Sequence, residues 1–410
     1  MMKVKRKIVE IKQAVEPIAE MAEPIINPIK DLADSGRLAG ILLLIATAIA
    51  MTWSNLPGGE SFAMFWDTKI GIAPLEKTLN HWINDGLMVI FFFFVGLEIK
   101  RELLEGELSS IRQAVLPGIA AIGGAILPAT LFVFFNRGAG NLDGWAIPTA
   151  TDIAFSLGVL SLLGDRVPFA LKVLLTAIAV IDDLIAVLVI ALFYTKEIEL
   201  TMLLYAGGAM VVLGALNYFK VRRFVFYLLP GLLLWFFILK SGVHATIAGV
   251  LLAMTIPLEE VDDLEHILYK PVSYLIMPIF ALANTAIALS GDIGSVLTTP
   301  LSYGIVSGLF LGKPLGIVAL SWVVVKLGWA ELPKGLRWRH IFGLGFTAGI
   351  GFTMSIFITN LSFEDTTMLN TAKVAIMTGT LLSAVVGLLW LIKVEQTLET
   401  KRETPEEVLA

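Results

Sequence analysis

The sequence predicts an all-α polytopic membrane protein that crosses the bilayer twelve times. Of its 410 residues, 57% are hydrophobic and only 16% are charged, whereas soluble globular proteins carry about 25% charged residues. Long apolar runs recur along the chain, and a spanning helix needs about 20 such residues. Only helices or closed barrels satisfy the backbone in lipid, and runs of this length favour helices.

The chain divides into three parts. A polar or amphipathic segment occupies 1–35, a twelve-helix domain occupies 36–393, and a tail occupies 394–410. The first part lacks an apolar core followed by a cleavage site, so no signal peptide is visible. Cysteine is absent, which excludes disulfides, thiolate metal sites and thiol catalysis. Turn residues or charges bound the predicted spans, which lie at 37–54, 85–104, 113–135, 144–164, 169–194, 200–219, 224–240, 242–257, 271–290, 301–326, 340–361 and 370–393.

The distribution of Lys and Arg predicts the orientation. With both termini in the cytoplasm, 23 of the 30 basic residues fall in cytoplasmic segments and six in external segments, while Lys313 lies inside a span. This bias follows the positive-inside rule. It also favours an even number of crossings.

The inner end of the second span carries a charge cluster. Glu98 and Arg101 are an i,i+3 pair of opposite charge, and Glu98 and Glu102 are a like-charged i,i+4 pair. The cluster is either a solvated helix end or a group whose protonation adjusts a neighbouring helix. The predicted cytoplasmic loop 258–270, which includes Glu265, is acidic. It could attract cations toward an entrance, or it is simply a solvated loop.

The span 144–164 is predicted to be a broken helix. Pro148 removes a backbone donor and tends to interrupt the helix, and broken helices occur in membranes where they line a cavity. Thr149, Thr151 and Asp152 follow it, so a hydroxyl, a carboxylate and free carbonyls could ligate sodium. Alternatively, Asp152 caps a half-helix and neutralises its dipole. The two roles are compatible.

Adjacent aspartates, Asp182 and Asp183, stand in the middle of the apolar run 169–194. A carboxylate at this depth costs roughly 2.5–3.5 kcal/mol on insertion scales and is usually functional. Neighbours on a helix differ by about 100° in direction, so one is expected to face a cavity and the other its rim or another helix. Holding a cation and a proton in exchange is the natural use of such a pair.

Lys313 lies about midway through the span 301–326. An ammonium buried alone tends to lose its proton, whereas a carboxylate neighbour holds it charged. We favour a salt bridge to Asp182 that sodium breaks, which would make the lysine a proton carrier. A structural counter-ion to Asp152 or to a helix end is the alternative.

The span 340–361 contains four glycines, at 343, 345, 349 and 351, followed by Thr353 and Ser355. This density of glycine permits local unwinding. Interrupted helices in corresponding positions of two repeats indicate a transporter site. We therefore expect spans 3–5 and 10–12 to be inverted repeats, each with its broken crossing helix in the middle.

The chain resembles the NhaA-type sodium/proton antiporters over nearly its whole length, a family that also exemplifies inverted-repeat transporters. The stretches that carry the resemblance occur in family order: VGLEIKRE (95–102), ATDIAF (150–155), IDDL (181–184), LKSGVHAT (239–246), GKPLG (312–316) and GIGFTMSIF (349–357).

The resemblance implies a cytoplasmic funnel that ends at Asp182 and Asp183. It implies that both aspartates bind sodium or lithium and protons, that Lys313 pairs with Asp182, and that Thr151 and Asp152 are the broken-helix residues beside the site. Family members often dimerise, so a homodimer is a further expectation. The residues that carry over as candidates for a pH response are Glu98, Arg101, Glu102 and Glu265.

The sequence therefore predicts a secondary transporter and not an enzyme. It would extrude sodium or lithium across the bacterial inner membrane in exchange for protons, electrogenically and under pH control, with Asp183 as the better candidate ion ligand and Asp182 as the proton switch. We expect no cofactor and no catalytic residue. The expected partners are the transported ions and membrane lipid, without nucleic acid. A sodium-coupled symporter of an organic anion is the alternative, although Lys313 alone offers positive charge at depth. An intramembrane aspartyl protease would need its carboxylates on separate helices, whereas here they are adjacent.

Overall fold

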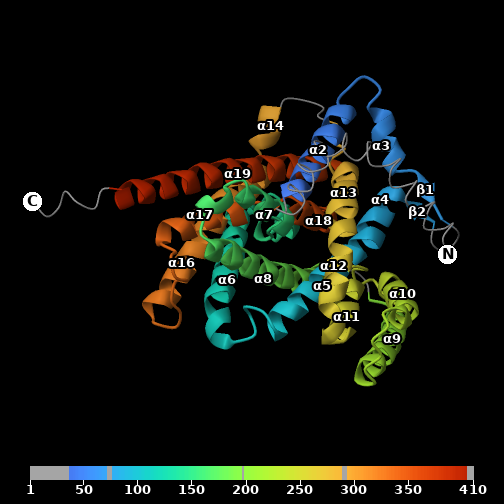
Figure 1. Cartoon of the computed structure of the whole chain (residues 1–410). Helices are drawn as coiled ribbons and strands as arrows, with labels where there is room; N and C mark the ends of the chain where they lie inside the picture. The colour runs from blue at the N-terminus through green and yellow to red at the C-terminus, as the bar shows by residue number, and fades with distance from the viewer. Residues whose placement is uncertain (1–36, 72–75, 196–197, 289–292, 404–410) are drawn as a thin grey trace, which may run out of the picture.

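The computed structural model describes residues 37–71, 76–195, 198–288 and 293–403, which are almost entirely helical (Figure 1). The predicted polar segment 1–35 and the end of the tail, 404–410, lie outside the described residues. The helices are α2 (Arg37–Ser54), α3 (Glu60–Trp66), α4 (Leu79–Trp82), α5 (Met88–Leu104), α6 (Ile111–Asn136), α7 (Ile153–Ser161), α8 (Phe169–Phe193), α9 (Leu200–Tyr218), α10 (Val225–Lys240), α11 (Ile247–Thr255), α12 (Val261–Pro271), α13 (Met277–Asn284), α14 (Ile293–Leu297), α15 (Pro300–Ser307), α16 (Lys313–Lys326), α17 (Trp338–Ala348), α18 (Phe352–Ser362) and α19 (Thr366–Glu403).

Short π-helical segments join several of these helices into longer rods. Ile83–Leu87 joins α4 to α5, Val272–Ile276 joins α12 to α13, and Gly308–Gly312 joins α15 to α16. Strands β1 (Lys69–Ile70) and β2 (Lys77–Thr78) form an antiparallel pair.

A multi-pass membrane protein is confirmed. Seven helical rods in the described part of the chain are long and apolar enough to cross a membrane, and the bent pair α17–α18 makes eight. Two more apolar helices, α2 and α10, are somewhat shorter. The other two predicted spans contain α7 and α11, which have 9 residues each.

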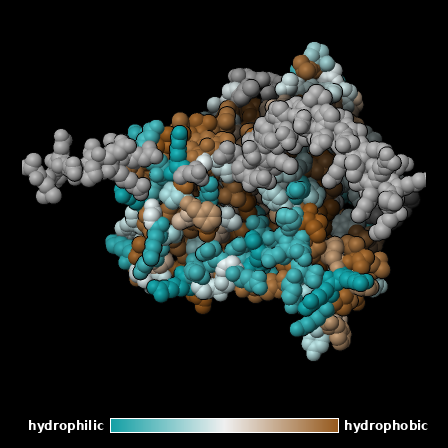
Figure 2. Space-filling view, viewed as in Figure 1, coloured by the Kyte–Doolittle hydropathy of each residue, from teal (hydrophilic) through white to brown (hydrophobic). Residues whose placement is uncertain are grey.

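Most helices pack in pairs, and α8 contacts α5, α6, α7 and α17. α6 lies along α16, α5 along α11, and α9 along α10, and the α9–α10 pair stands at the edge of the molecule (Figure 1). Large apolar side chains such as Leu192 and Leu204 remain 75% and 68% exposed. Brown, hydrophobic surface accordingly lies between teal patches in Figure 2. An exposed apolar surface of this kind fits a lipid environment.

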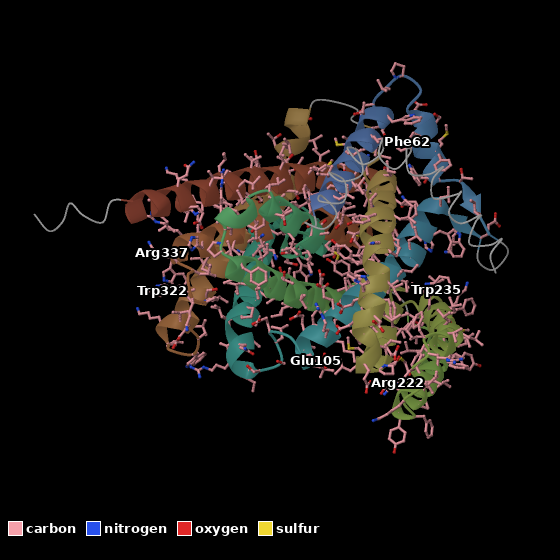
Figure 3. All side chains as sticks on the ribbon, viewed as in Figure 1. Phe62, Glu105, Arg222, Trp235, Trp322 and Arg337 are labelled. Atoms are coloured by element: carbon pink, nitrogen blue, oxygen red, sulfur yellow. The ribbon has the colours of Figure 1, made fainter. Side chains whose placement is uncertain are left out.

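The terms "inner" and "outer" are used below for the helix ends next to the predicted cytoplasmic and the predicted external segments. Figure 3 shows Glu105 and Arg222, of predicted cytoplasmic segments, at the lower side of the molecule and Arg337, of another such segment, at the left. Phe62, in a predicted external segment, lies at the upper side.

One prediction was wrong: the stretch 258–270 is not a loop. It forms a 3₁₀ turn and α12, and the rod Leu258–Asn284 continues from it without interruption. Val261 and Leu264 are buried at helical spacing, whereas Asp262, Asp263 and His266 are exposed. The charges that indicated a loop therefore occupy the outward face of an amphipathic helix.

The structure also contains elements that the apolar runs did not predict. α3, the β1–β2 pair and α14 lie in predicted connections. α19 continues to Glu403, ten residues beyond the predicted end of the last span at 393.

Candidate functional site

Two broken helices meet at the centre of the molecule. The first interruption, 150–152, follows a 3₁₀ turn that contains Pro148 and precedes α7. The second, 349–351, separates α17 from α18, whose axes differ by 48°. The backbone N–H of Asp152 donates to the carbonyl of Ile350 at 2.7 Å, so the two interruptions are joined directly.

The carboxylate of Asp152 caps both half-helices. Its Oδ1 accepts from the backbone N–H of Phe155 at 2.9 Å, in the first turn of α7. Its Oδ2 accepts from the backbone N–H of Thr353 at 3.1 Å and from the Thr353 hydroxyl, in the first turn of α18. A negative charge at two helix N-termini is favourable. The structure therefore shows the capping arrangement for Asp152, and its side chain also lines the cavity described below.

Two buried serines connect the broken helices in a reciprocal way. Ser156, the fourth residue of α7, donates to the carbonyl of Thr347 near the end of α17 at 2.9 Å. Ser355, the fourth residue of α18, donates to the carbonyl of Ile147 at 2.7 Å. The Ser355 hydroxyl thus satisfies a carbonyl at the first interruption, while the Ser156 hydroxyl adds a second bond to the Thr347 carbonyl, which also accepts from the backbone N–H of Ile350 at 3.2 Å.

Asp182 is held by a lysine and a threonine. Its Oδ2 accepts from Lys313 Nζ, which forms an ion pair with it, and from Thr151 Oγ1 at 2.6 Å. Thr151 Oγ1 also lies 2.8 Å from the carbonyl of Ala348. All three side chains are buried. Of the two partners considered for Lys313 in the sequence, the structure pairs it with Asp182.

Close packing of two glycines places Lys313 at this depth. Lys313 is the first residue of α16, which lies along α6. A Cβ added at Gly123 would overlap the carbonyl of Gly316, and a Cβ added at Gly316 would overlap the carbonyl of Gly123. Only residues without a side chain permit this approach.

Asp183 faces a different direction from Asp182. It lines a cavity of about 1380 Å³, whereas Asp182 does not. Among the described residues, no side chain or backbone group forms a hydrogen bond or ion pair with its carboxylate, and its Oδ1 is buried without a partner. The expectation of a funnel that ends at both aspartates is therefore corrected: the cavity reaches Asp183, and Asp182 lies behind it.

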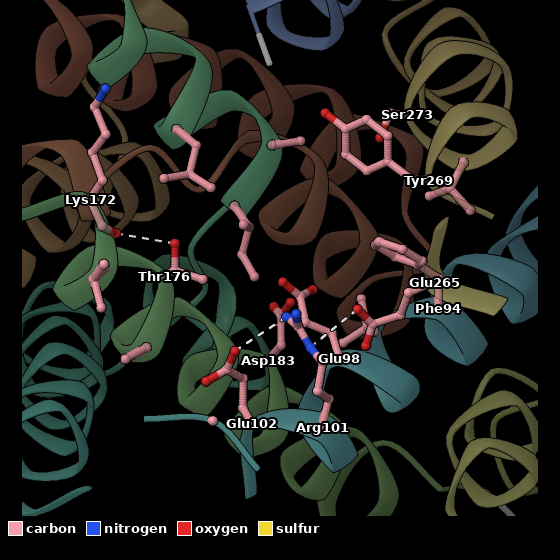
Figure 4. Close-up of a pocket in the computed structure, with 18 of the residues that line it drawn as sticks. Phe94, Glu98, Arg101, Glu102, Lys172, Thr176, Asp183, Glu265, Tyr269 and Ser273 are labelled. Carbon is pink, nitrogen blue, oxygen red and sulfur yellow. Dashed lines mark hydrogen bonds and ion pairs between the residues drawn. The ribbon is translucent and has the colours of Figure 1, made fainter. Parts of the chain in front are cut away.

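The cavity opens between predicted cytoplasmic ends of helices. Its wall includes Glu105 to Glu107 after α5, Gly164 after α7, and His266 of α12. On the way to Asp183 it carries an ionic cluster, in which Arg101 Nε lies 3.3 Å from Glu265 Oε2 and Arg101 Nη2 lies 3.2 Å from Glu102 Oε1. Figure 4 shows Glu98, Arg101, Glu102, Glu265 and Asp183 converging on this cavity.

The sequence reasoning assigned no partner to two polar residues, Thr353 and Lys100. Thr353 binds Asp152 through both its backbone and its hydroxyl. Lys100 is buried and donates to the carbonyls of Met254 and Ile256 at the end of α11. The position of Thr353 directly after a glycine-rich interruption was an available signal. Lys100 gave none, because a lysine at the end of a span resembles an ordinary interfacial charge.

The arrangement suits a monovalent cation and a proton better than a polydentate metal centre. In the described part of the chain, no three His, Asp or Glu side chains gather as a metal site. The site instead offers one unpartnered carboxylate in a cavity of about 1380 Å³, with a second carboxylate whose charge a lysine compensates.

Known proteins resemble the chain over most of its length. The Na+/H+ antiporter 1 family matches residues 30–391. Na(+)/H(+) antiporter NhaA 2 of Flavobacterium johnsoniae is 50% identical over 368 residues, which cover 87% of this chain and 90% of that protein. Na(+)/H(+) antiporter NhaA of Salmonella arizonae is 50% identical over 371 residues, which cover 87% and 96%.

A solved structure shares the fold. The sodium proton antiporter MjNhaP1 from Methanocaldococcus jannaschii aligns with a TM-score of 0.52 and 17% identity, and the alignment covers 95% of this chain and 98% of that one. The sequence matches are long and specific, and the chain therefore belongs to the Na+/H+ antiporter 1 family, whose members are secondary transporters and not enzymes.

Proposed function

We propose that this protein exchanges sodium or lithium from the cytoplasm for external protons across the bacterial inner membrane. The observation that carries the proposal is the split aspartate pair: Asp183 ends a cavity of about 1380 Å³, and Asp182 is held by Lys313 behind it. The Asp183 carboxylate is open to the cavity, and a cation could displace Lys313 from Asp182. This arrangement supports competition between a metal cation and protons.

In the proposed cycle, sodium arrives through the inner cavity and binds Asp183 and Asp182. The ion takes the place of the Lys313 ammonium at Asp182, so the lysine can release its proton. The hydroxyl of Thr151 lies within hydrogen-bond distance of Asp182 and can turn its oxygen toward the cation. On the outer side, protons return to the lysine and to Asp183 and expel the ion.

This scheme supports electrogenic exchange. A proton bound at Asp183 and a proton bound at Lys313 would both leave when one sodium ion binds, so more positive charge would move inward than outward. The membrane potential then contributes about 2.3 kcal/mol per net charge per 100 mV.

We further propose twelve spans arranged as inverted repeats, with α6–α8 and α15–α19 as the repeated units. Two reciprocal contacts support this. Ser156 and Ser355 each bind the opposite broken helix from the fourth position of their own half-helix, and Gly123 and Gly316 each meet the backbone of the other. If a twofold axis relates the two repeats, each contact from the first repeat to the second has an equivalent contact from the second to the first. Both pairs of contacts have this property.

The ionic cluster on the cavity wall is the proposed pH-responsive region. Arg101 of α5 pairs with Glu265 of α12 on the cavity wall, and Glu98 and Glu102 lie on the same wall. Protonation of an acid in this cluster would weaken the link between α5 and α12. We expect membrane lipid around the apolar faces, both termini in the cytoplasm, and a homodimer, which native mass spectrometry in detergent would identify.

Sodium-dependent proton movement in proteoliposomes tests the function. The unmutated protein should exchange sodium for protons without any organic solute, and a requirement for an organic anion would instead indicate symport. Asp183→Asn should abolish exchange, because the variant keeps the size of the side chain but loses its charge. Full activity of this variant would overturn the competition mechanism.

A further inference from the structure

A second, smaller cavity lies on the outer side of the molecule. It has a volume of about 400 Å³, and its lining includes residues of predicted external segments such as Lys77 and Glu364. Neither Asp182 nor Asp183 lines it. Because the inner cavity already reaches Asp183, something must separate the ion site from the outer cavity in this structure.

An aromatic layer occupies the floor of the outer cavity. Phe357 of α18 is fully buried and lines this cavity. Its ring centroid lies 5.3 Å from that of Phe92 on α5 and 6.4 Å from that of Phe280 on α13. Three helices thus meet at one apolar layer.

A layer of asparagines lies farther out on the same three rods, one turn from the phenylalanine on α18 and α13 and about two turns from Phe92. Asn360 Nδ2 donates to Asn284 Oδ1 at 2.6 Å, and Asn284 Nδ2 donates to Asn84 Oδ1 at 3.0 Å. Asn360 follows Phe357 by three residues and Asn284 follows Phe280 by four, so each amide lies on the same face as its phenylalanine. Asn84 precedes Phe92 by eight residues, in the π-helical segment Ile83–Leu87.

Asn284 is the middle member of this series of hydrogen-bonded asparagines. Its side chain is 1% exposed, and its second amide hydrogen is donated to the carbonyl of Phe280 at 3.0 Å. Asn84 Nδ2 in turn donates to Asn80 Oδ1 at 2.8 Å. The amides therefore point head to tail from α18 through α13 to the π-helical segment and α4, an arrangement in which neighbouring hydrogen bonds strengthen one another.

We propose that Asn284 holds an outer gate closed by bridging Asn360 of the broken helix to Asn84. The inference rests on the proposed function, since only a transporter needs to expose its site to each side in turn. Amides suit a gate because water can replace each hydrogen bond when the layers part, so neither state is strongly favoured. α18 connects the gate to the ion site, because Thr353, Phe357 and Asn360 follow one another along one face.

The absence of cysteine makes the gate directly testable. Met88 is fully buried and lies four residues from both Asn84 and Phe92, between the two layers. In a Met88→Cys protein, a membrane-impermeant maleimide added to intact cells should react slowly. Adding Asn284→Leu should raise the rate about tenfold, because the closed state loses two hydrogen bonds that water supplies in the open state.

Two further variants decide the result. Asn360→Leu removes only the bond from α18 and should raise the rate severalfold, and it provides the test if Asn284→Leu does not fold. Asn80→Leu makes the same change at the outer end of the asparagine series. It leaves the Asn360–Asn284 and Asn284–Asn84 hydrogen bonds intact and should leave the labelling rate unchanged. Unchanged labelling in Asn360→Leu, or equal acceleration in Asn80→Leu, would overturn the gate.

The labelling readout is independent of transport. If the unmutated protein failed to exchange sodium for protons while the three variants behaved as expected, the proposed function would fail and the gate would stand. Normal exchange with no effect of Asn284 or Asn360 on labelling would leave the function intact and remove the gate.

Discussion

Replacing Lys313 by methionine should destabilise the protein strongly, because it leaves a buried carboxylate without its cation. Lys313 and Asp182 are 0% and 1% exposed at their side chains. Breaking a buried pair of this kind costs about 3–5 kcal/mol. Methionine keeps nearly the length of lysine, so packing against α6 changes little and the loss is mainly electrostatic.

A neutral partner should restore most of this loss. In Lys313→Met/Asp182→Asn no uncompensated charge remains, and the new amide can still accept from Thr151. Replacing a buried pair by neutral groups is often nearly neutral for stability, so the double variant should be closer to the unmutated protein than the single variant. Lys172→Met is the matched control, since Lys172 is only half-buried and forms no ion pair among the described residues. It should change stability by less than about 0.5 kcal/mol.

Thermal unfolding in detergent provides the assay. A single variant as stable as the unmutated protein would refute the buried ion pair. So would a double variant that is as unstable as the single one.

Three further predictions follow from the contacts around the site. Thr151→Val should raise the sodium concentration for half-maximal exchange several-fold, whereas Thr151→Ser, which retains the hydroxyl bound to Asp182, should behave almost normally in a proteoliposome exchange assay. Gly316→Ala should destabilise the protein by roughly 1–3 kcal/mol, because the added Cβ would overlap the Gly123 backbone. Gly207→Ala is the control in the same unfolding assay, since a Cβ at that position would meet nothing within 4 Å. Competition between sodium and protons should raise the apparent KM for sodium as pH falls, and a KM that stays constant across pH in the proteoliposome exchange assay would contradict shared binding.

Much of the fold could be predicted because lipid imposes simple rules. Long apolar runs such as 169–194 and 301–326 had to be helices, and α8 and the α15–α16 rod lie where these runs do. Pro148 and the glycines at 349 and 351 marked both interruptions. The stretch 258–270 was predicted wrongly to be a loop because its charged residues were counted and their spacing was ignored. The helical spacing puts the apolar residues Val261 and Leu264 on one buried face.

The site could be predicted only in part. A pair of carboxylates within an apolar run, such as Asp182 and Asp183, can be recognised from the sequence because burying them in a membrane costs free energy. A single lysine in the middle of another run, Lys313, can be recognised in the same way. The sequence does not reveal which aspartate faces the cavity, because a rotation of about 100° separates them and only the packing of α8 fixes that rotation. Contacts such as Asn360 to Asn284 join residues 76 positions apart and carry no local pattern.

The hydrogen bonds between the broken helices also constrain how the protein can move. The backbone N–H of Asp152 and the hydroxyls of Ser156 and Ser355 all bond from one broken helix to the other, and these three residues are buried. Separating the helices would leave several polar groups unsatisfied at once, each at a penalty of about 1–3 kcal/mol. Movement between the two broken helices is therefore far more costly than movement of both together past α13, where the bond from Asn360 to Asn284 can be replaced by water. Exchange of the site between the two sides should accordingly proceed with the crossed helices as one rigid unit.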